Sequence, residues 1–318
     1  MPFSHHSHSG QFCMHAKGSL EEMVLAAIDR KMTVFALTEH MPRDDEDLYP
    51  EEKQAHASLA SLTATYDAFY AEATRLRAAY AAQITLLIGF EGEWIRSPRS
   101  HALTTALLRN PRYALDLFVG SVHHVNGHPI DLDRATYARA RASAGSGGAG
   151  TDADLAAAYL DAQRDMLRAL RPPVVGHFDL VRLFSDAPDA PWRGRAAAVW
   201  ARVRRNLELA RAYGSVLEVN QAALRKGLRE PYPRAEICSE FLAMGGRFTL
   251  SDDSHSTDQV GMNYPRVLAF IKKVGIKEVY FFERVDSKDS PPKMSSLSVE
   301  ELEKHPSWST YDSSEAEP

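Results

Sequence analysis

Cysteine is nearly absent from this sequence: Cys13 and Cys238 are the only two among 318 residues. Two cysteines in a chain of this length do not form a disulfide framework, which favours a reducing compartment. No hydrophobic run approaches the roughly 20 residues that a membrane-spanning helix needs. The first residues, MPFSH, lack the basic and apolar regions of a signal peptide. We therefore expect a soluble cytoplasmic protein with no membrane partner.

An excess of positive charge is also missing. Lysine and arginine number 37 against 42 acidic residues, which gives a net charge of −5 and argues against a dedicated nucleic-acid-binding protein. Apolar residues at 44% and charged residues at 25% are ordinary for a globular protein. The length allows one large α/β domain or two small ones, and no feature of the sequence indicates an oligomeric state.

Short apolar, β-branched runs alternate with amphipathic stretches along the chain. This alternation favours parallel βα units over an antiparallel sheet. The predicted strands are 34–37, 84–90, 117–122, 173–176, 216–219, 248–250 and 279–282, with a further strand at the amino terminus. The predicted helices are one starting after Ser19, whose capping box includes Glu22, and those at 54–82, 154–170, 193–213, 234–244 and 257–274.

Two segments differ in composition from the predicted core. Residues 139–151 (RARASAGSGGAGT) are rich in glycine, alanine and serine and predict a flexible insertion. Residues 286–318 are polar and predict a surface-bound or partly disordered tail. The sequence therefore predicts one folded domain over 1–285 followed by that tail.

Histidine, in contrast, is abundant: the chain has 13, most of them just after predicted strands. A barrel of parallel strands gathers the carboxyl ends of its strands on one face, so these side chains should meet there. Imidazole and carboxylate ligands suit zinc, iron and manganese. The predicted ligands of this polynuclear site are His6, His8, His15, His40, Glu91, His123, His177, Asp253 and His255.

The alternation of side chains along a strand supports some of these ligand assignments. Residues two apart point to the same side of a strand, so His6 and His8 can reach one metal while His5 faces away. Glu91 directly follows a predicted strand and is the preferred bridging carboxylate, with Glu93 as an orienting or substrate-contacting residue.

Two ligand choices stay open at this point. Only one of His123 and His124 can point inward, and His123 is preferred. Asp252 competes with Asp253, although an aspartate here could also cap the following helix.

Taken in order, these motifs resemble the polymerase and histidinol phosphatase (PHP) family of metal-dependent phosphoesterases. The matching motifs are His-x-His at 6 and 8, His15, Thr-Glu-His at 38–40, Gly-Phe-Glu at 89–91, Gly-Ser-Val-His at 120–123, Gly-His-Phe-Asp at 176–179 and Ser-Asp-Asp-Ser-His at 251–255. The resemblance covers about residues 3–282. Each motif is weak alone, but their order is specific. The stretches SHHSHSG, FALTEH, GSVHHVNG and LEVN resemble the fungal-like, monofunctional histidinol-phosphate phosphatases.

The resemblance implies a distorted, TIM-like (β/α)7 barrel with a trinuclear metal centre at the carboxyl ends of its strands. The predicted strands number eight, one more than this barrel holds, so 279–282 is expected to be a closing segment. By position, one metal would take His6, His8, Glu91 and Asp253. A second would take Glu91, His123 and His177, and a third His15, His40 and His255.

The activity that the resemblance implies is hydrolysis of L-histidinol phosphate in histidine biosynthesis by metal-activated water. Arg182 and Arg225 match basic positions of the family and would neutralise the phosphate, and Asn220 begins the phosphate-side loop. Asp253 and His255 are candidates for protonating the leaving group, as is a metal-bound water. The substrate cation would be held by an acidic residue, for which the candidates are Glu93, Glu218 and Asp179.

Three other functions are weighed against this one. A nuclease or nucleotide phosphatase of the same family would use the same metals, but the acidic net charge disfavours it. A non-catalytic metal-stabilised module would be expected to have lost ligands, whereas every expected position holds a competent residue. A metal-dependent amidohydrolase would be expected to carry a lysine at a strand end, and none follows these strands.

Overall fold

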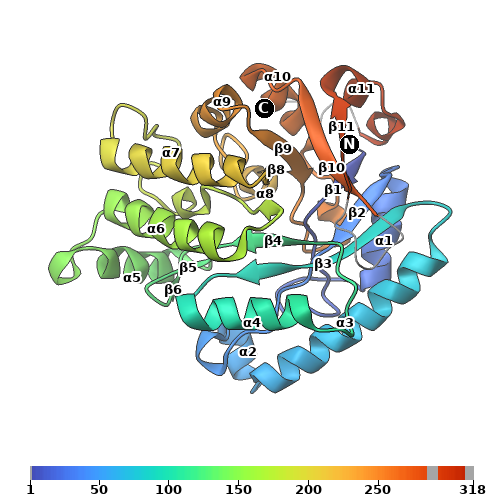
Figure 1. The fold of residues 1–318 in the computed structure, drawn as a ribbon, viewed down its shortest axis with the longest axis horizontal. Helices are drawn as coiled ribbons and strands as arrows, with labels where there is room; N and C mark the ends of the chain where they lie inside the picture. Colours follow the sequence, from blue (N-terminus) through green and yellow to red (C-terminus); the bar gives the residue numbers. More distant parts are fainter. Residues whose placement is uncertain (1, 285–292, 312–318) are drawn as a thin grey trace.

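The fold is a nearly closed barrel of seven parallel strands surrounded by helices, as seen in a computed structural model that describes residues 2–284 and 293–311 (Figure 1). The strands of this sheet, in spatial order, are β1 (Phe3–Ser4), β2 (Val34–Leu37), β3 (Thr85–Glu93), β4 (Leu117–Ser121), β7 (Val174–Val175), β8 (Val216–Asn220) and β9 (Arg247–Ser251). The two edges approach each other, because the amide of His5 donates to the carbonyl of Leu250 at 3.1 Å. This architecture is the predicted (β/α)7 barrel.

The run at 279–282 forms β10 (Glu278–Glu283), which lies outside the barrel sheet. It pairs antiparallel with β11 (Lys293–Ser298), and the ring of Phe281 stacks on Phe3 at 5.2 Å between centroids. The run at 279–282 is therefore not an eighth barrel strand, in agreement with the expected seven-stranded barrel. A separate antiparallel hairpin is made by β5 (His124–Val125) and β6 (His128–Pro129).

The helices mostly follow the predicted pattern, and they cover the outside of the barrel (Figure 1). They are α1 (Leu20–Asp29), α2 (Pro50–Gln54), α3 (Leu59–Ala79), α4 (Ser97–Arg109), α5 (Arg134–Ala144), α6 (Asp152–Leu170), α7 (Ala197–Ala212), α8 (Ala222–Arg225), α9 (Ala235–Ala243), α10 (Tyr264–Val274) and α11 (Val299–Glu303). The Ser19 capping box starts α1 as expected. The predicted helix at 54–82 is divided, because Ser58 caps a new helix, and the one at 257–274 becomes regular only at Tyr264.

Parts of the two segments of unusual composition form regular structure. Residues 139–144 of the glycine-rich insertion form the end of α5, where Ala140 is buried, so this part of the insertion is helical. Of the tail, residues 293–311 form β11, α11 and a 3-10 turn, with Leu302 buried. Residues 286–292 and 312–318 of the tail lie outside the described residues. Within the described parts of the chain, we find no helix with the length and apolarity to span a membrane.

The packed interior of the barrel fixes the positions of the polar residues at the ends of the strands. Apolar side chains fill its core, and the chemistry-bearing residues follow at the carboxyl ends of the strands. Gly176, just before His177, allows β4 and β7 to approach closely. A Cβ atom at this position would lie 2.4 Å from the Ser121 hydroxyl oxygen. The glycine therefore permits the backbone spacing that brings His177 toward its neighbours.

Candidate metal centre

Glu91 lies at the middle of the site, with its two carboxylate oxygens directed at different histidines. Oε2 lies 3.3 Å from His6 Nε2 and 3.4 Å from His8 Nε2. Oε1 lies 3.3 Å from His123 Nε2 and 3.0 Å from His177 Nε2. The side chain is buried on β3. One carboxylate that faces two ligand groups in this way can bridge two metal ions.

The first ligand group contains His6, His8 and Asp253, all buried and with ligand atoms within 4.8 Å of one another. The prediction from side-chain alternation is confirmed, because His6 and His8 face the group while His5 turns away to contact Thr249 and the amide of Phe282. Asp253 has a left-handed backbone (φ 49°), a conformation that aspartate tolerates better than most residues.

The second group contains Glu91, His123 and His177. The Nε2 atoms of the two histidines lie 3.1 Å apart, with both rings against Oε1 of Glu91. Of the pair that the sequence left open, His123 is the one that points into the centre. His124 belongs to β5, and its ring lies beside Tyr49 instead.

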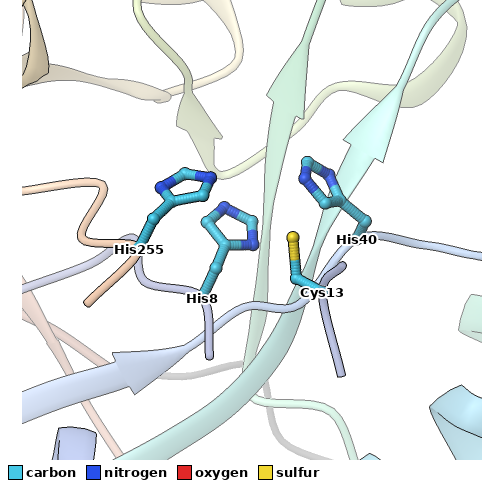
Figure 2. A group of neighbouring side chains, drawn as sticks. All are labelled: His8, Cys13, His40 and His255. Carbon is cyan, nitrogen blue, oxygen red and sulfur yellow. The ribbon is translucent and has the colours of Figure 1, made fainter. Parts of the chain in front are cut away.

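The third group contains His8, Cys13, His40 and His255 (Figure 2). His15 adjoins it, with Nε2 lying 3.4 Å from His40 Nε2 and 3.2 Å from Cys13 Sγ. The sequence-predicted set of His15, His40 and His255 is thus brought together, with a thiol that the sequence analysis gave no role.

Asp252, the alternative to Asp253, is directed away from the metal-ligand groups. Its carboxylate accepts hydrogen bonds from the Ser4 hydroxyl at 2.9 Å and from the amides of Ser254 at 3.2 Å and Gly261 at 2.9 Å. Burial raises the pKa of this carboxyl. Asp252 therefore ties the β9 loop to β1 and leaves the centre to Asp253.

Glu218 on β8 holds two of the histidines in position. Its Oε2 lies 3.1 Å from His6 Nδ1, and its Oε1 accepts a hydrogen bond from the His177 amide at 2.6 Å. Ser251 and Asn220 also donate to it, at 2.6 and 2.8 Å. A carboxylate on the far nitrogen of a ligand histidine fixes its tautomer and orientation.

The electrostatics of the centre follow from its burial. Burial lowers the pKa of His123, but the neighbouring carboxylates of Glu91 and Glu93 act in the opposite direction, and the net result is a pKa raised to about 10. Burial raises the pKa of Glu91, yet the neighbouring His6 and His123 hold it well below its ordinary value. In the metal-free protein, protonated imidazoles thus face an ionised carboxylate. Metal binding must displace these protons.

The donor set fits divalent metal ions. Nε2 of His6 and both ring nitrogens of His8 are buried and make no hydrogen bond among the described residues. Buried polar atoms without partners are costly in a native protein. Imidazole nitrogens and carboxylate oxygens that converge in this way are what zinc, iron or manganese binds.

A cavity of about 270 Å³ opens above the centre. Glu91, His123, His177 and Asp253 contribute to its lining, as do His40 and His255 of the third group. The other lining residues are His15, Tyr49, Glu51, Asp131, Leu132, Leu180, Arg225, Lys226 and Gln259. A small metabolite could therefore reach the ligand groups.

Of the two arginines predicted to contact phosphate, only Arg225 lines this cavity. Its guanidinium donates to the carbonyls of Asp252 at 3.2 Å and Asp253 at 3.0 Å. Arg182 is buried elsewhere, paired with Asp179 at 2.9 Å and donating to the carbonyl of Pro231. The structure does not bring Arg182 to the cavity.

The other predicted substrate contacts are also engaged by the protein. Asn220 is buried between Glu218 and Asp253, and its Oδ1 accepts from the Ala222 amide. Glu93 is held by Arg43 at 2.6 Å and by the Tyr49 hydroxyl at 3.1 Å.

Neither Glu218 nor Asp179, the remaining candidates for the substrate cation, lines the cavity. Asp179 is paired with both Arg182 and Arg234. The sequence analysis missed two carboxylates that do line the cavity, Glu51 and Asp131.

Comparison with known proteins places this centre in a family. The model of the PHP domain matches residues 4–222. The chain belongs to the PHP family.

Two fungal proteins are similar to this PHP protein over most of their length. The "Probable histidinol-phosphatase" of Schizosaccharomyces pombe is 41% identical over 285 residues, covering 89% of this chain and 90% of the relative. The "Histidinol-phosphatase" of Saccharomyces cerevisiae is 30% identical, covering 96% and 98%. Among solved structures, histidinol phosphate phosphatase from Lactococcus lactis shares the fold, with a TM-score of 0.62, 18% identity and coverage of 89% and 97%. That structure is a complex with zinc, L-histidinol and phosphate.

Proposed function

We propose that this PHP protein is a metal-dependent phosphatase that hydrolyses L-histidinol phosphate to L-histidinol and phosphate. The observation that carries the proposal is the set of ligand residues that converges on Glu91 beneath one cavity. It is supported by fungal relatives named histidinol-phosphatases that match nearly the whole chain. The bacterial structure of the same fold that holds zinc, L-histidinol and phosphate supports the choice of substrate. The free thiols of Cys13 and Cys238 support a cytoplasmic location.

The centre would hold three divalent ions. His6, His8 and Asp253 would hold one, and His123 and His177 a second, with Glu91 shared between them. His40 and His255, with His15 beside them, would hold the third. Bound divalent ions supply Lewis-acid chemistry, because they neutralise phosphoryl oxygens and lower the pKa of water. Zinc is the favoured ion, with iron and manganese as alternatives.

The cavity wall would bind the two ends of the substrate. Arg225 and Lys226 are the cationic side chains that line the cavity, so they are placed to neutralise a phosphate above the metal ligands. Two carboxylates line the wall outside the metal-ligand groups, Glu51 and Asp131. Glu51 is paired with His15 at 3.0 Å, whereas Asp131 makes no hydrogen bond or ion pair with the residues that the structure describes. We assign Asp131 to the substrate cation.

Replacing Asp131 with asparagine should raise KM for histidinol phosphate roughly tenfold, because a hydrogen bond to a charged group contributes about 1.5–3 kcal/mol. KM for p-nitrophenyl phosphate, which carries no cation, should change little. Arg225→Gln is the matched comparison and should raise KM for both substrates. Steady-state kinetics with the two substrates measures this, and an equal effect of Asp131→Asn on both would contradict the assignment.

The proposed function is tested by phosphate release from a panel of substrates. Purified protein is given L-histidinol phosphate, p-nitrophenyl phosphate, a nucleoside monophosphate and a short oligonucleotide, each before and after chelation. We expect a strong preference for histidinol phosphate that is lost on chelation and restored by zinc or manganese.

The other outcomes point to other functions. Turnover of the oligonucleotide or nucleotide without histidinol phosphate turnover would move the function to the nuclease or nucleotidase branch of the family. No turnover by metal-loaded protein would favour a non-catalytic, metal-stabilised module.

A further inference from the structure

Cys13 is built into the third ligand group. It lies in the loop between β1 and α1, where its amide donates to the carbonyl of Ser9 at 2.9 Å and its carbonyl accepts from the amide of Ala16 at 3.1 Å. The side chain is only 5% exposed. Figure 2 shows the sulfur pointing toward the same space as the imidazoles of His8, His40 and His255. The ligand atoms of these four side chains lie within 4.8 Å of one another.

The histidines around Cys13 turn their Nδ1 atoms toward oxygen acceptors. Nδ1 of His15 lies 3.0 Å from Glu51, and Nδ1 of His255 lies 2.9 Å from the carbonyl of Asp253. Nδ1 of His40 lies 3.1 Å from Glu91. Metal-binding histidines commonly engage one ring nitrogen with a carboxylate or carbonyl, which leaves the other for the ion. The free nitrogens, Nε2, are thus available beside the thiol.

His8 is less suited to this third position than its proximity suggests. Its Nε2 faces Glu91 at 3.4 Å and Asp253 at 3.6 Å, which are partners in the first group. Its Nδ1 faces Glu39 at 3.6 Å. With His8 committed to the first ion, the donor atoms that remain around the third position are imidazole nitrogens and the sulfur of Cys13.

The second cysteine, Cys238, has the surroundings of a purely structural thiol and can be compared with Cys13. Cys238 on α9 is fully buried, and its thiol donates to the carbonyl of Pro233 at 3.2 Å. Cys13 instead has an imidazole nitrogen as its neighbour, at 3.2 Å from His15 Nε2. The two cysteines therefore differ in surroundings, and Cys238 is a matched control for Cys13.

We infer that Cys13 is a sulfur ligand of the third metal ion, completing a mixed thiolate and imidazole site with His15, His40 and His255. This inference rests on the proposed metal-dependent function. When the metal binds, the thiol releases its proton to solvent and a metal–sulfur bond forms, with no change in oxidation state. Thiolate with imidazole is a donor set that favours zinc over manganese. The third position should therefore be the one most selective for zinc.

Cobalt substitution tests the inference without relying on activity. Zinc in the full-length protein is replaced with Co²⁺, and the near-ultraviolet spectrum is recorded together with the bound cobalt per chain. We expect a sulfur-to-cobalt charge-transfer band in the native sequence and in Cys238→Ser. Cys13→Ser should lose the band, and its weakest-bound zinc should be released at chelator concentrations at least about tenfold lower, since even outer partners of a ligand contribute 10–100-fold to metal affinity.

Thiol alkylation of the unmodified protein gives a second measurement that needs no variant. Iodoacetamide followed by peptide mass spectrometry should label Cys13 in chelated protein and spare it in zinc-loaded protein, while Cys238 reacts in neither. Equal labelling of Cys13 with and without zinc would overturn the inference.

The failure of this inference is distinguishable from failure of the phosphatase proposal. Cobalt-loaded protein that hydrolyses histidinol phosphate but shows no sulfur band rules out Cys13 as a ligand and leaves the function intact. Protein that neither binds cobalt nor hydrolyses histidinol phosphate would overturn both.

Discussion

Replacing Glu91 with glutamine should reduce kcat for histidinol phosphate by roughly 10³-fold or more, beyond the 10–100-fold typical of residues that only orient a ligand. The reason is geometric. One oxygen of Glu91 faces His6 and the other faces His177, at 3.3 and 3.0 Å. Glutamine has the same shape, but its amide nitrogen cannot bind a metal and it removes the negative charge between the two groups.

Metal content should fall along with turnover in this variant. We expect Glu91→Gln to lose at least one zinc per chain by elemental analysis while its circular dichroism stays native. Glu93→Gln is the matched comparison, because Glu93 is also buried on β3 but is held by Arg43 and Tyr49. It should lose less metal and less activity than Glu91→Gln, because Glu93 faces only the outer nitrogens of two ligands, His40 Nδ1 at 3.1 Å and His123 Nδ1 at 3.7 Å. A Glu91→Gln protein with full metal content and near-native kcat would disprove the bridging role.

The fold and the centre of the site could be predicted because strand ends leave a clear pattern in the sequence. Each buried strand is a short apolar run, and the residue type changes sharply where the run ends, as at Phe90 and Glu91. The spacing of His6 and His8 fixes their common direction by strand alternation alone. The alternation of side chains along a strand could not decide between His123 and His124, because the choice depends on the residue at which β4 ends. A shift of that end by one residue reverses which of the two histidines points inward.

The cavity wall could not be predicted in the same way, because its residues come from loops whose paths depend on tertiary contacts. Arg182 was expected at the phosphate, but the buried Asp179 three residues earlier pairs with it and holds it away from the cavity. Asp131 follows no strand end and carried no signal in the sequence. The sequence did carry a signal for Cys13, because this residue lies between the predicted ligands His8 and His15. Its position in the loop, however, does not show in which direction the thiol points.

Replacing Glu218 with glutamine should lower kcat about 10–100-fold and weaken zinc binding by a similar factor, as is usual for an outer partner of a ligand histidine. Glu218 does not line the cavity above the centre, so the expected effect acts through the positions of His6 and His177. Its carboxylate faces His6 Nδ1 at 3.1 Å and accepts from the His177 amide at 2.6 Å. Burial raises the pKa of Glu218, but the combined opposing effects of His6 and His177 keep this pKa below its ordinary value, so the carboxylate is ionised at neutral pH.

Glutamine at 218 keeps only one oxygen. If that oxygen still accepts from the His177 amide, as Oε1 does, an amide nitrogen replaces Oε2 and cannot accept a hydrogen bond from His6 Nδ1 or from the Ser251 hydroxyl. His6 is then free to change tautomer or rotate, and its ligand nitrogen is lost from the first group. Asp252→Asn is the control, since Asp252 is an equally buried carboxyl beside the centre that faces Ser4 and Gly261 instead. We expect its zinc affinity to stay close to that of the native protein. If both variants lost zinc equally, the effect would come from general disruption of the barrel end, and Glu218 would have no specific role in holding His6.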